Sequence, residues 1–229
     1  MILKQWNELP DEMKNSQVNM YYNILCEHKN SLAFKRIFDI LFSIILLVAF
    51  SPVFLVISLL IKFDSEGPIF YRQERVTQFN KVFKIHKFRT MINKADMVGT
   101  GVTVNNDDRI TKVGKFLRKY RLDELPQLID IFLGDMTFVG TRPESVKYVK
   151  YYTDEMFATL LLPAGVTSIA SIKYKDEALL LDSAENADEV YVNKILPEKM
   201  KYNLQSIKDF SFLNELKTIF KTVYVVFTE

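Results

Sequence analysis

Residues 40–61 read ILFSIILLVAFSPVFLVISLLI and carry no charge over 22 positions. As one straight helix they would span about 33 Å, against about 30 Å for the hydrocarbon core of a bilayer. Ser51 and Pro52 lie in the middle, where proline removes a backbone hydrogen bond and bends the helix. Each arm would reach about 16–18 Å, which predicts a re-entrant helix that enters and leaves on one face. A kinked transmembrane helix stays the alternative, since many such helices contain proline.

Basic residues flank both ends of this segment. Lys35 and Arg36 precede it, and Lys62, Arg72 and Arg75 follow it. The positive-inside rule therefore selects no single orientation, as expected if both flanks face the cytoplasm. This pattern predicts that the N-terminus and the domain after the segment lie on the cytoplasmic face of a membrane.

Length and composition limit the remaining possibilities. A chain of 229 residues holds one domain with a sizeable core and a small appendage. Cys26 is the only cysteine, so no disulfide framework or cysteine metal site is expected, and a reducing compartment is favoured. Only two histidines are present, His28 and His86, and we expect surface or packing roles for them. The apolar segment begins too far from Met1 for a signal peptide.

The net charge of +2 hides an uneven distribution. Residues 71–121 contain thirteen Lys or Arg and four Asp or Glu, which gives +9 and leaves −7 for the rest of the chain. Such a basic block suits phosphorylated substrates, anionic lipid headgroups or nucleic acid. Its position beside the membrane segment favours phosphate and lipid. No nucleic-acid partner is expected, because no helix-turn-helix, zinc finger or aromatic RNA-binding pattern is present.

A pair of adjacent carboxylates lies within this basic context. Residues 118–127 read RKYRLDELPQ and place Asp123 and Glu124 directly behind Arg and Lys. No Walker-type loop is present, and Gly99-Thr-Gly101 lacks the third glycine of a dinucleotide-binding turn. A nucleophile elbow around serine is also missing. These residues therefore indicate phosphate chemistry at a membrane surface, carried by carboxylates and bases.

The pattern along the chain predicts a predominantly helical α+β fold. We expect a re-entrant membrane hairpin, amphipathic surface helices and a small mixed α/β core. Apolar spacing and turn residues predict strands at 69–71 and 82–88 and a helix at 111–121. A further helix over 125–133 would begin at Asp123 and Glu124 and end at Gly134. Other expected helices cover 92–98, before a loop at 99–108, then 144–162 and 212–227. For the Val-rich end of the last one, a strand is the alternative.

Three regions follow from these elements. Residues 1–33 form a polar, mildly amphipathic extension with an apolar stripe from Val18 to Ile24. Residues 34–62 form the membrane segment, and residues 63–229 form the cytoplasmic domain, within which Asp176 to Glu189 is acidic without one base.

With these residues the chain resembles the bacterial sugar transferase family, the monotopic polyprenyl-phosphate phosphoglycosyl transferases. The resemblance is strongest from Lys35 to Lys150 and weaker over 151–229. It rests on ordered motifs with the family's spacing, namely Lys35-Arg-Ile-Phe-Asp39, Ser51-Pro52, Asp64-Ser-Glu-Gly-Pro-Ile-Phe-Tyr-Arg-Gln-Glu-Arg75, Phe83-Lys-Ile-His-Lys-Phe-Arg-Thr-Met91, Asn106 to Arg118, Leu122-Asp-Glu-Leu-Pro-Gln-Leu128 and Gly134-Asp-Met136.

The resemblance implies transfer of a sugar-1-phosphate from a UDP-sugar to a polyprenyl (undecaprenyl) phosphate, with release of UMP. This would be the first membrane step of bacterial glycan assembly, such as capsule polysaccharide biosynthesis, at the cytoplasmic membrane. Asp123 would be the nucleophile that forms a phosphosugar intermediate, and Glu124 would hold Mg²⁺. Substrate phosphates would be bound by four basic residues, Arg118, Arg142, Arg89 and Lys87.

Two departures from the family pattern concern the substrate pocket. The family's Pro-Arg-Pro reads Thr141-Arg142-Pro143, and its Gly-Ile/Val-Thr-Gly-Leu-Ala-Gln reads Gly165-Val-Thr-Ser-Ile-Ala-Ser171. We therefore predict that residues after Pro163 determine the choice of sugar. The acidic run would close over the site or bind sugar hydroxyls, and a solvated surface loop is the alternative.

Two other functions stay open. A conventional UDP-sugar glycosyltransferase would need an Asp-x-Asp metal motif, and Asn106-Asp-Asp108 lacks that spacing. A membrane-anchored adaptor would need only the basic block for anionic lipids. Whether two copies pair as a homodimer is also open.

Overall fold

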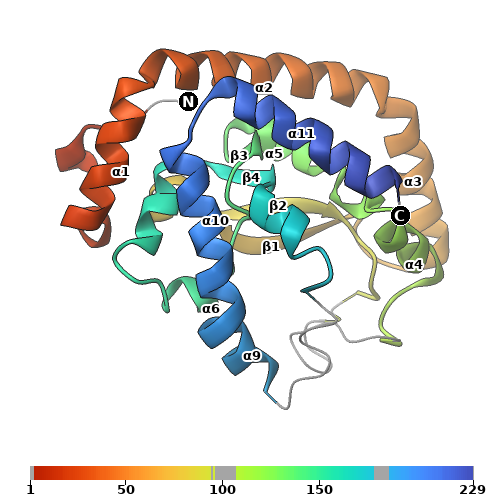
Figure 1. Cartoon of the computed structure of the whole chain (residues 1–229). Helices are drawn as coiled ribbons and strands as arrows, with labels where there is room; N and C mark the ends of the chain where they lie inside the picture. The colour runs from red at the N-terminus through yellow and green to blue at the C-terminus, as the bar shows by residue number, and fades with distance from the viewer. Residues whose placement is uncertain (1–2, 94, 96–106, 178–185, 229) are drawn as a thin grey trace.

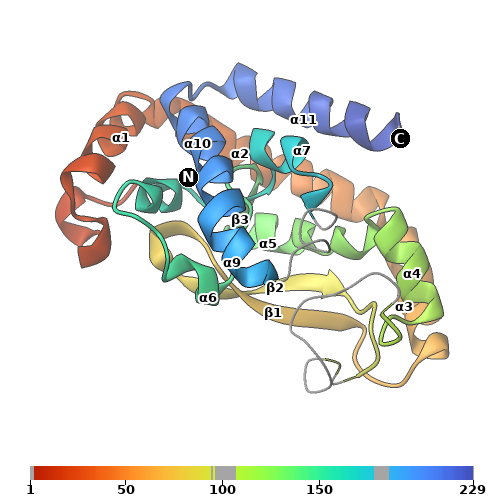
Figure 2. The same cartoon turned by 60° about the horizontal axis from the view of Figure 1, so that its bottom comes forward.

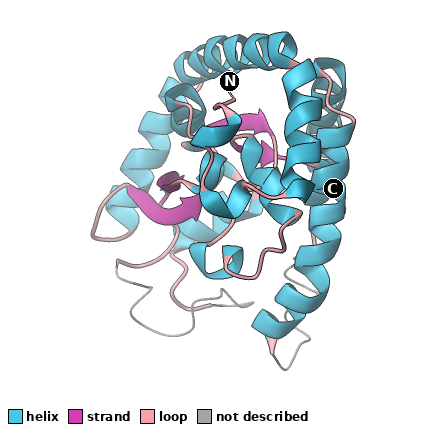
Figure 3. Cartoon of the chain, turned by 90° about the vertical axis from the view of Figure 1, so that its left-hand side faces the viewer, coloured by secondary structure: helices cyan, strands magenta, loops and turns pink. Residues whose placement is uncertain are grey.

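The computed structural model describes residues 3–93, 95, 107–177 and 186–228. Helices dominate these residues and surround two small sheets (Figure 3). An α+β fold that is mostly helical is therefore confirmed. The helices are α1 (Ser16–Glu27), α2 (Lys29–Ala49), α3 (Ser51–Asp64), α4 (Lys112–Lys119), α5 (Gln127–Leu133), α6 (Val146–Val149), α7 (Ile169–Lys173), α9 (Ala187–Val190), α10 (Leu196–Lys208) and α11 (Phe212–Phe227).

Helices α2 and α3 form a bent pair at the predicted break. Their axes turn by 61° between Ala49 and Ser51, and Pro52 lies in the first turn of α3. The Ser51 hydroxyl donates to the carbonyl oxygen of Val48 at 2.8 Å. No single described helix is long and apolar enough to cross a membrane, whereas this pair meets the length and composition requirement together. Figure 1 shows α2 along the top of the molecule, α3 turning down from its end, and α11 beside α2.

Polar side chains fasten α2 to the rest of the protein. Lys35, 2 % exposed, donates to the Val139 carbonyl oxygen at 2.9 Å and pairs with Glu215 of α11. Arg36 donates to the carbonyl oxygens of Ile131 and Phe132, at 2.6 and 2.8 Å. The two basic residues that precede the apolar segment thus bind other parts of the protein. Their charges are therefore weak evidence for the side of the membrane on which the N-terminus lies.

Two pairs of strands form the sheets. Strands β1 (Phe70–Val76) and β2 (Val82–Phe88) are antiparallel, with Phe70 opposite Phe88, which confirms both expected strands. Strands β3 (Met136–Val139) and β4 (Ala164–Thr167) are parallel, with Met136 opposite Ala164. Figure 2 shows the β1–β2 ribbon on the side of the molecule away from α11.

Three apolar clusters hold these elements together. The largest joins α1, residues 149–162 and α10, and it buries Val18 and Tyr21 of the predicted N-terminal stripe together with the adjacent Leu25. A second cluster lies between β2, α5, β3 and β4, and a third joins α3, β2 and α4. Residues 1–33 therefore contribute to the main core through α1.

The observed helices agree only in part with those expected from the sequence. The helices over 111–121 and 212–227 are confirmed as α4 and α11, and Gly134 ends α5 with a φ of 95°. The long helix over 144–162 is wrong, because the chain forms only α6 and a 3-10 segment, Met156–Leu161. Asp123 and Glu124 occupy a separate 3-10 turn, Leu122–Glu124, before α5 begins at Gln127. Most of the predicted 92–98 helix and 99–108 loop lies outside the described residues.

Gly114 sets the approach of α4 to the chain after β2. A Cβ atom there would lie 2.0 Å from the Thr90 carbonyl oxygen, which is backbone and cannot turn aside. We expect Gly114→Ala to lower the free energy of unfolding by about 1–3 kcal/mol, measured by urea denaturation in detergent. The exposed neighbour Lys115 gives the control, since Lys115→Ala should change stability little. Equal stability of Gly114→Ala and wild type would contradict this account.

Candidate active site

The carboxylate pair lies on a tight turn between α4 and α5. Arg121 adopts the left-handed conformation, with a φ of 56°, and the chain then forms the 3-10 turn Leu122–Glu124. Pro126 follows and begins the next helical segment. Because each end of this turn is fixed by a packed helix, Asp123 and Glu124 are held on rigid elements.

Glu124 is the centre of a three-residue cluster, which we call the Glu124 cluster and which also contains Lys87 and Arg142. Lys87 Nζ donates to Glu124 Oε1 at 2.8 Å, and the Arg142 guanidinium donates to both oxygens. Burial alone would raise the pKa of Glu124, but the charges of Arg142 and Lys87 hold it well below its ordinary value. Glu124 therefore stays ionised at any physiological pH.

Asp123 has the opposite electrostatic environment. Burial raises its pKa, and the negative charge of Glu124 raises it further. Lys87 and Arg118 act in the other direction without cancelling the shift. Two adjacent carboxylates with pKa values moved apart are typical of a site where they have different roles.

Arg118 and Arg89 have different positions around this pair. Arg118 donates from Nε to Thr90 Oγ1 at 2.9 Å, and both Nη atoms have no hydrogen-bond partner within the described residues. Arg89 is 5 % exposed and donates to the Ser65 carbonyl oxygen at 2.6 Å, at the end of α3. Arg118 thus keeps donors for a ligand, whereas one Nη of Arg89 is bound to the backbone.

Three cavities meet at the Glu124 cluster. The basic cavity, about 700 Å³, contains Lys87 and Glu124, together with Asp123, Arg118 and Arg89. The mixed cavity, about 250 Å³, contains Lys87 and Arg142. The apolar cavity, about 280 Å³, contains Glu124 and Arg142. The structure therefore brings all six predicted polar site residues to the walls of cavities that share one cluster.

The basic and apolar cavities differ in their walls. Seven Arg or Lys side chains and two carboxylates line the basic cavity: Arg72, Arg75, Lys87, Arg89, Arg109, Arg118, Arg121, Asp123 and Glu124. The apolar cavity extends from the Glu124 cluster to Leu46 and Phe50, beside the break between α2 and α3, and to Val225 of α11. A polar compartment and an apolar one thus meet at the same carboxylate.

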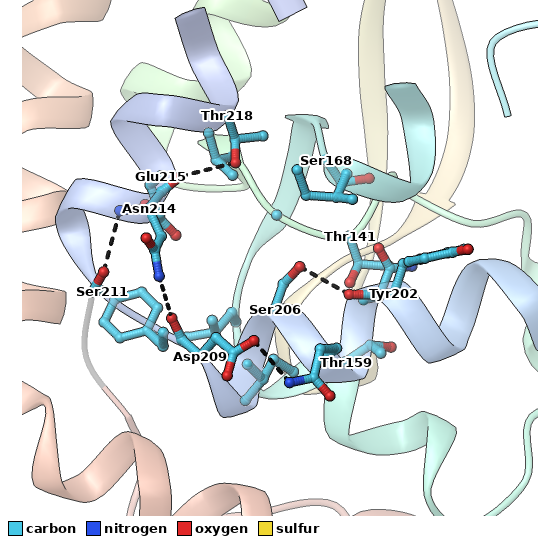
Figure 4. Close-up of a pocket in the computed structure, with 18 of the residues that line it drawn as sticks. Thr141, Thr159, Ser168, Tyr202, Ser206, Asp209, Ser211, Asn214, Glu215 and Thr218 are labelled. Atoms are coloured by element: carbon cyan, nitrogen blue, oxygen red, sulfur yellow. Dashed lines mark hydrogen bonds between the residues drawn. The ribbon is translucent and has the colours of Figure 1, made fainter. Parts of the chain in front are cut away.

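A fourth cavity, about 380 Å³, lies between α10 and α11 and contains none of the predicted site residues (Figure 4). Its polar groups bond to one another: Asn214 donates to the Asp209 carbonyl oxygen at 2.9 Å, and Ser206 to that of Tyr202 at 2.9 Å. Burial raises the pKa of Glu215, at its wall, to about 7. Nothing in this cavity points to the chemistry of the Glu124 cluster.

The donor set is suitable for Mg²⁺. No group of three or more metal-ligating side chains occurs within residues 3–93, 95, 107–177 and 186–228. Mg²⁺ is commonly bound by one or two carboxylates, with substrate phosphates and water completing the octahedron. Asp123 and Glu124 supply that number of carboxylates beside a cavity rich in bases. The residues present therefore fit a metal that arrives with a phosphorylated substrate.

Sequence reasoning missed several residues of these walls. Gln127, Thr90 and Arg75 line the cavities or position a side chain there, and none of them was expected at the site, although they lie within the motifs that carry the resemblance. His86 of β2, expected at the surface or in packing, contacts buried Asp130 of α5 through Nδ1 at 2.6 Å, so it has a structural role in joining β2 to α5.

The chain belongs to the bacterial sugar transferase family, whose sequence pattern matches residues 30–229. It is 33 % identical over 198 residues to a UDP-N-acetylgalactosamine-undecaprenyl-phosphate N-acetylgalactosaminephosphotransferase of Aeromonas hydrophila, covering 85 % of this chain and 44 % of that protein. It is 34 % identical over 198 residues to a UDP-glucose:undecaprenyl-phosphate glucose-1-phosphate transferase of Klebsiella pneumoniae, covering 85 % and 40 %.

A third relative is closer in length. The exopolysaccharide production protein ExoY of Sinorhizobium fredii is 32 % identical over 207 residues, covering 84 % of each chain. By contrast, the chain spans less than half the length of the Aeromonas and Klebsiella relatives.

Proposed function

We propose that this protein is a phosphoglycosyl transferase that moves a sugar-1-phosphate from a UDP-sugar to undecaprenyl phosphate and releases UMP. The observation that carries the proposal is the meeting of a basic and an apolar cavity at Glu124, directly beside Asp123, which lines the basic cavity. Family membership and the names of the relatives support it. The setting would be polysaccharide synthesis at a bacterial membrane.

The first step is an attack by an Asp123 carboxylate oxygen on the phosphorus that carries the sugar. A phosphorus–oxygen bond forms to Asp123, the bond to the UMP oxygen breaks, and UMP leaves with that electron pair. Arg118, through its two Nη atoms, would bind phosphate oxygens as charge develops on them. Mg²⁺, when bound at Glu124, would neutralise charge on the diphosphate. Lys87 and Arg142 would then be available for phosphate oxygens.

The second step brings in the lipid. A phosphate oxygen of undecaprenyl phosphate attacks the same phosphorus, and the bond to Asp123 breaks, which restores the free carboxylate. The apolar cavity suits the first isoprene units of the lipid, because it leads from Arg142 and Glu124 to Phe50 and Leu46 near the helix break. An amphiphile with one phosphate and a long apolar tail matches this arrangement of walls.

A direct assay separates the three candidate functions. Purified protein with undecaprenyl phosphate should release UMP from at least one UDP-sugar. Release of UDP would indicate a conventional glycosyltransferase, and release of neither nucleotide would favour a membrane-anchored adaptor.

The α2–α3 pair is proposed to be re-entrant, with both ends on the cytoplasmic face. Exposed apolar side chains support a membrane location, among them Leu41, Ile45, Val48, Leu55 and Val56, which are 55–69 % exposed. Cys26 tests the topology, since it is the only thiol and precedes the pair. A membrane-impermeant thiol reagent should label it only after cells are opened.

A second label position completes this test. Lys115 is exposed on α4, after the helix pair, so a cysteine there in a Cys26→Ser background should show the same protection. Labelling of one position in intact cells and not the other would show that the chain crosses the bilayer. Pro52→Ala should straighten the pair and move part of the population toward such a span.

A further inference from the structure

The mixed cavity has no role in the two steps proposed above, but it adjoins the basic and apolar cavities in which those steps would take place. It shares Lys87 and Arg75 with the basic cavity that contains Asp123, and Arg142 with the apolar cavity. A group attached to a phosphate at Lys87 would therefore have a third direction in which to extend. In a UDP-sugar, the phosphorus next to the sugar carries such a group.

The mixed cavity is lined both by hydrogen-bond acceptors and by aromatic rings. The Glu144 carboxylate accepts from the Tyr191 hydroxyl at 2.5 Å, and Glu177 accepts from Lys199 Nζ at 2.6 Å. The centroids of the Tyr191 and Tyr148 rings lie 4.5 Å apart. Carboxylates beside tyrosine rings suit a compact ligand with many hydroxyl donors and small apolar faces, which describes a pyranose.

Two amides in the same walls have oxygens without a partner. Gln127 and Asn203 are 2 % and 5 % exposed, and neither Gln127 Oε1 nor Asn203 Oδ1 has a hydrogen-bond partner within the described residues. Buried polar atoms normally find one, because an unmet acceptor costs free energy. Asn203 also lines the α10–α11 cavity and Gln127 the apolar cavity, but of the four cavities described only the mixed cavity is lined by both. A single ligand there with hydroxyl or amide N–H donors would satisfy both.

We propose that the mixed cavity binds the sugar of the UDP-sugar, and that Asn203 and Gln127 accept hydrogen bonds from its hydroxyl or acetamido N–H groups. This inference rests on the proposed function and deepens it. It also locates the predicted sugar-determining region, since Ser168, Ser171 and Glu177 line this cavity. Residues 178–185 of the acidic run lie outside the described residues.

Two serines of this cavity depart from the family pattern described above. Ser168 and Ser171 stand where the family pattern has Gly and Gln, and their hydroxyl oxygens lie 3.0 Å apart. Ser168 also accepts from the Ser171 backbone N–H at 3.0 Å and caps α7. A longer Gln side chain at position 171 would fill space that Ser leaves open. The sugar preference of this protein should therefore differ from that of relatives with Gln at this position.

Binding measurements test the proposal independently of turnover. The full chain in lipid nanodiscs is titrated with UDP-glucose, UDP-N-acetylgalactosamine and UDP-N-acetylglucosamine, and with UDP, which lacks the sugar. Wild type should bind at least one UDP-sugar more tightly than UDP. Asn203→Leu should weaken binding of that UDP-sugar at least tenfold and leave UDP binding unchanged, because UDP lacks the sugar that would contact Asn203.

Two further variants provide a second test and a control. Glu177→Gln keeps the shape of a second wall residue and should weaken the same UDP-sugar, which keeps the test valid if Asn203→Leu does not fold. Gln205→Leu is the matched control, since Gln205 is an exposed amide on α10 that lines only the α10–α11 cavity among the four cavities described. It should change neither affinity.

The outcomes are distinguishable. If the UDP-sugars bind no more tightly than UDP, or if Asn203→Leu and Glu177→Gln weaken UDP and UDP-sugar equally, the mixed cavity is not the sugar site. UMP release by the wild type would then still support the proposed function. If neither UDP nor any UDP-sugar binds, both proposals fail together.

Discussion

Asp123→Asn is expected to lower turnover about 10⁴-fold, because it keeps the shape and hydrogen bonding of the side chain but removes the attacking charge. UMP release from a UDP-sugar in the presence of undecaprenyl phosphate measures the effect. A UDP-sugar labelled in the phosphate next to the sugar should leave label on the wild-type chain and none on the variant. Asp108→Asn is the control, since Asp108 is exposed and lines none of the cavities described.

The pH dependence follows from the raised pKa of Asp123. Burial and the charge of Glu124 favour the protonated carboxyl, and only the ionised form attacks phosphorus. Activity should therefore fall with decreasing pH at values above the ordinary aspartate pKa of about 3.9. Near-normal turnover of Asp123→Asn, or an acid limb below that value in wild type, would refute the assignment.

Glu124→Gln is expected to lower turnover about 10²–10³-fold and to weaken the dependence of rate on Mg²⁺, because it removes a metal ligand and the anionic partner of Lys87 and Arg142. Magnesium titrations of wild type and variant measure both effects. The variant should also move the acid limb of activity to lower pH, since a negative neighbour of Asp123 is lost.

These readouts separate a metal-binding role from a structural one. A variant that lost only stability would melt at lower temperature but keep the magnesium dependence and the acid limb of wild type. Full activity of wild type in excess chelator would overturn the proposed magnesium requirement.

The local features of the fold were predictable from the sequence because they depend on neighbouring residues. The break at Ser51-Pro52, the end of α5 at Gly134 and the strand β2 all have such local causes. The failed helix over 144–162 has a different cause. Its last part is buried on all sides, with Ala158 and Leu161 inaccessible to solvent, so its apolar residues fill a core and do not mark one helical face.

The site was predictable to the extent that one segment carries it. Arg118 and Asp123 lie in the same ten residues, whereas the pairing of Glu124 with Lys87 spans 37 residues and depends on how β2 packs against the turn. Asn203 comes from α10, far along the chain, and only the folded protein brings it to the mixed cavity beside Gln127. Such residues carry no local signature in the sequence.

The contacts of Arg36 have a geometric consequence. By holding the Ile131 and Phe132 carbonyl oxygens, Arg36 joins the end of α5 to α2, and Lys35 joins the end of β3 to the same helix. If α2 rests in the bilayer as proposed, the height of Asp123 above the membrane plane is fixed by these bonds. The protein would then accept a lipid phosphate presented at that one depth, while the water-soluble UDP-sugar reaches Asp123 from the aqueous side.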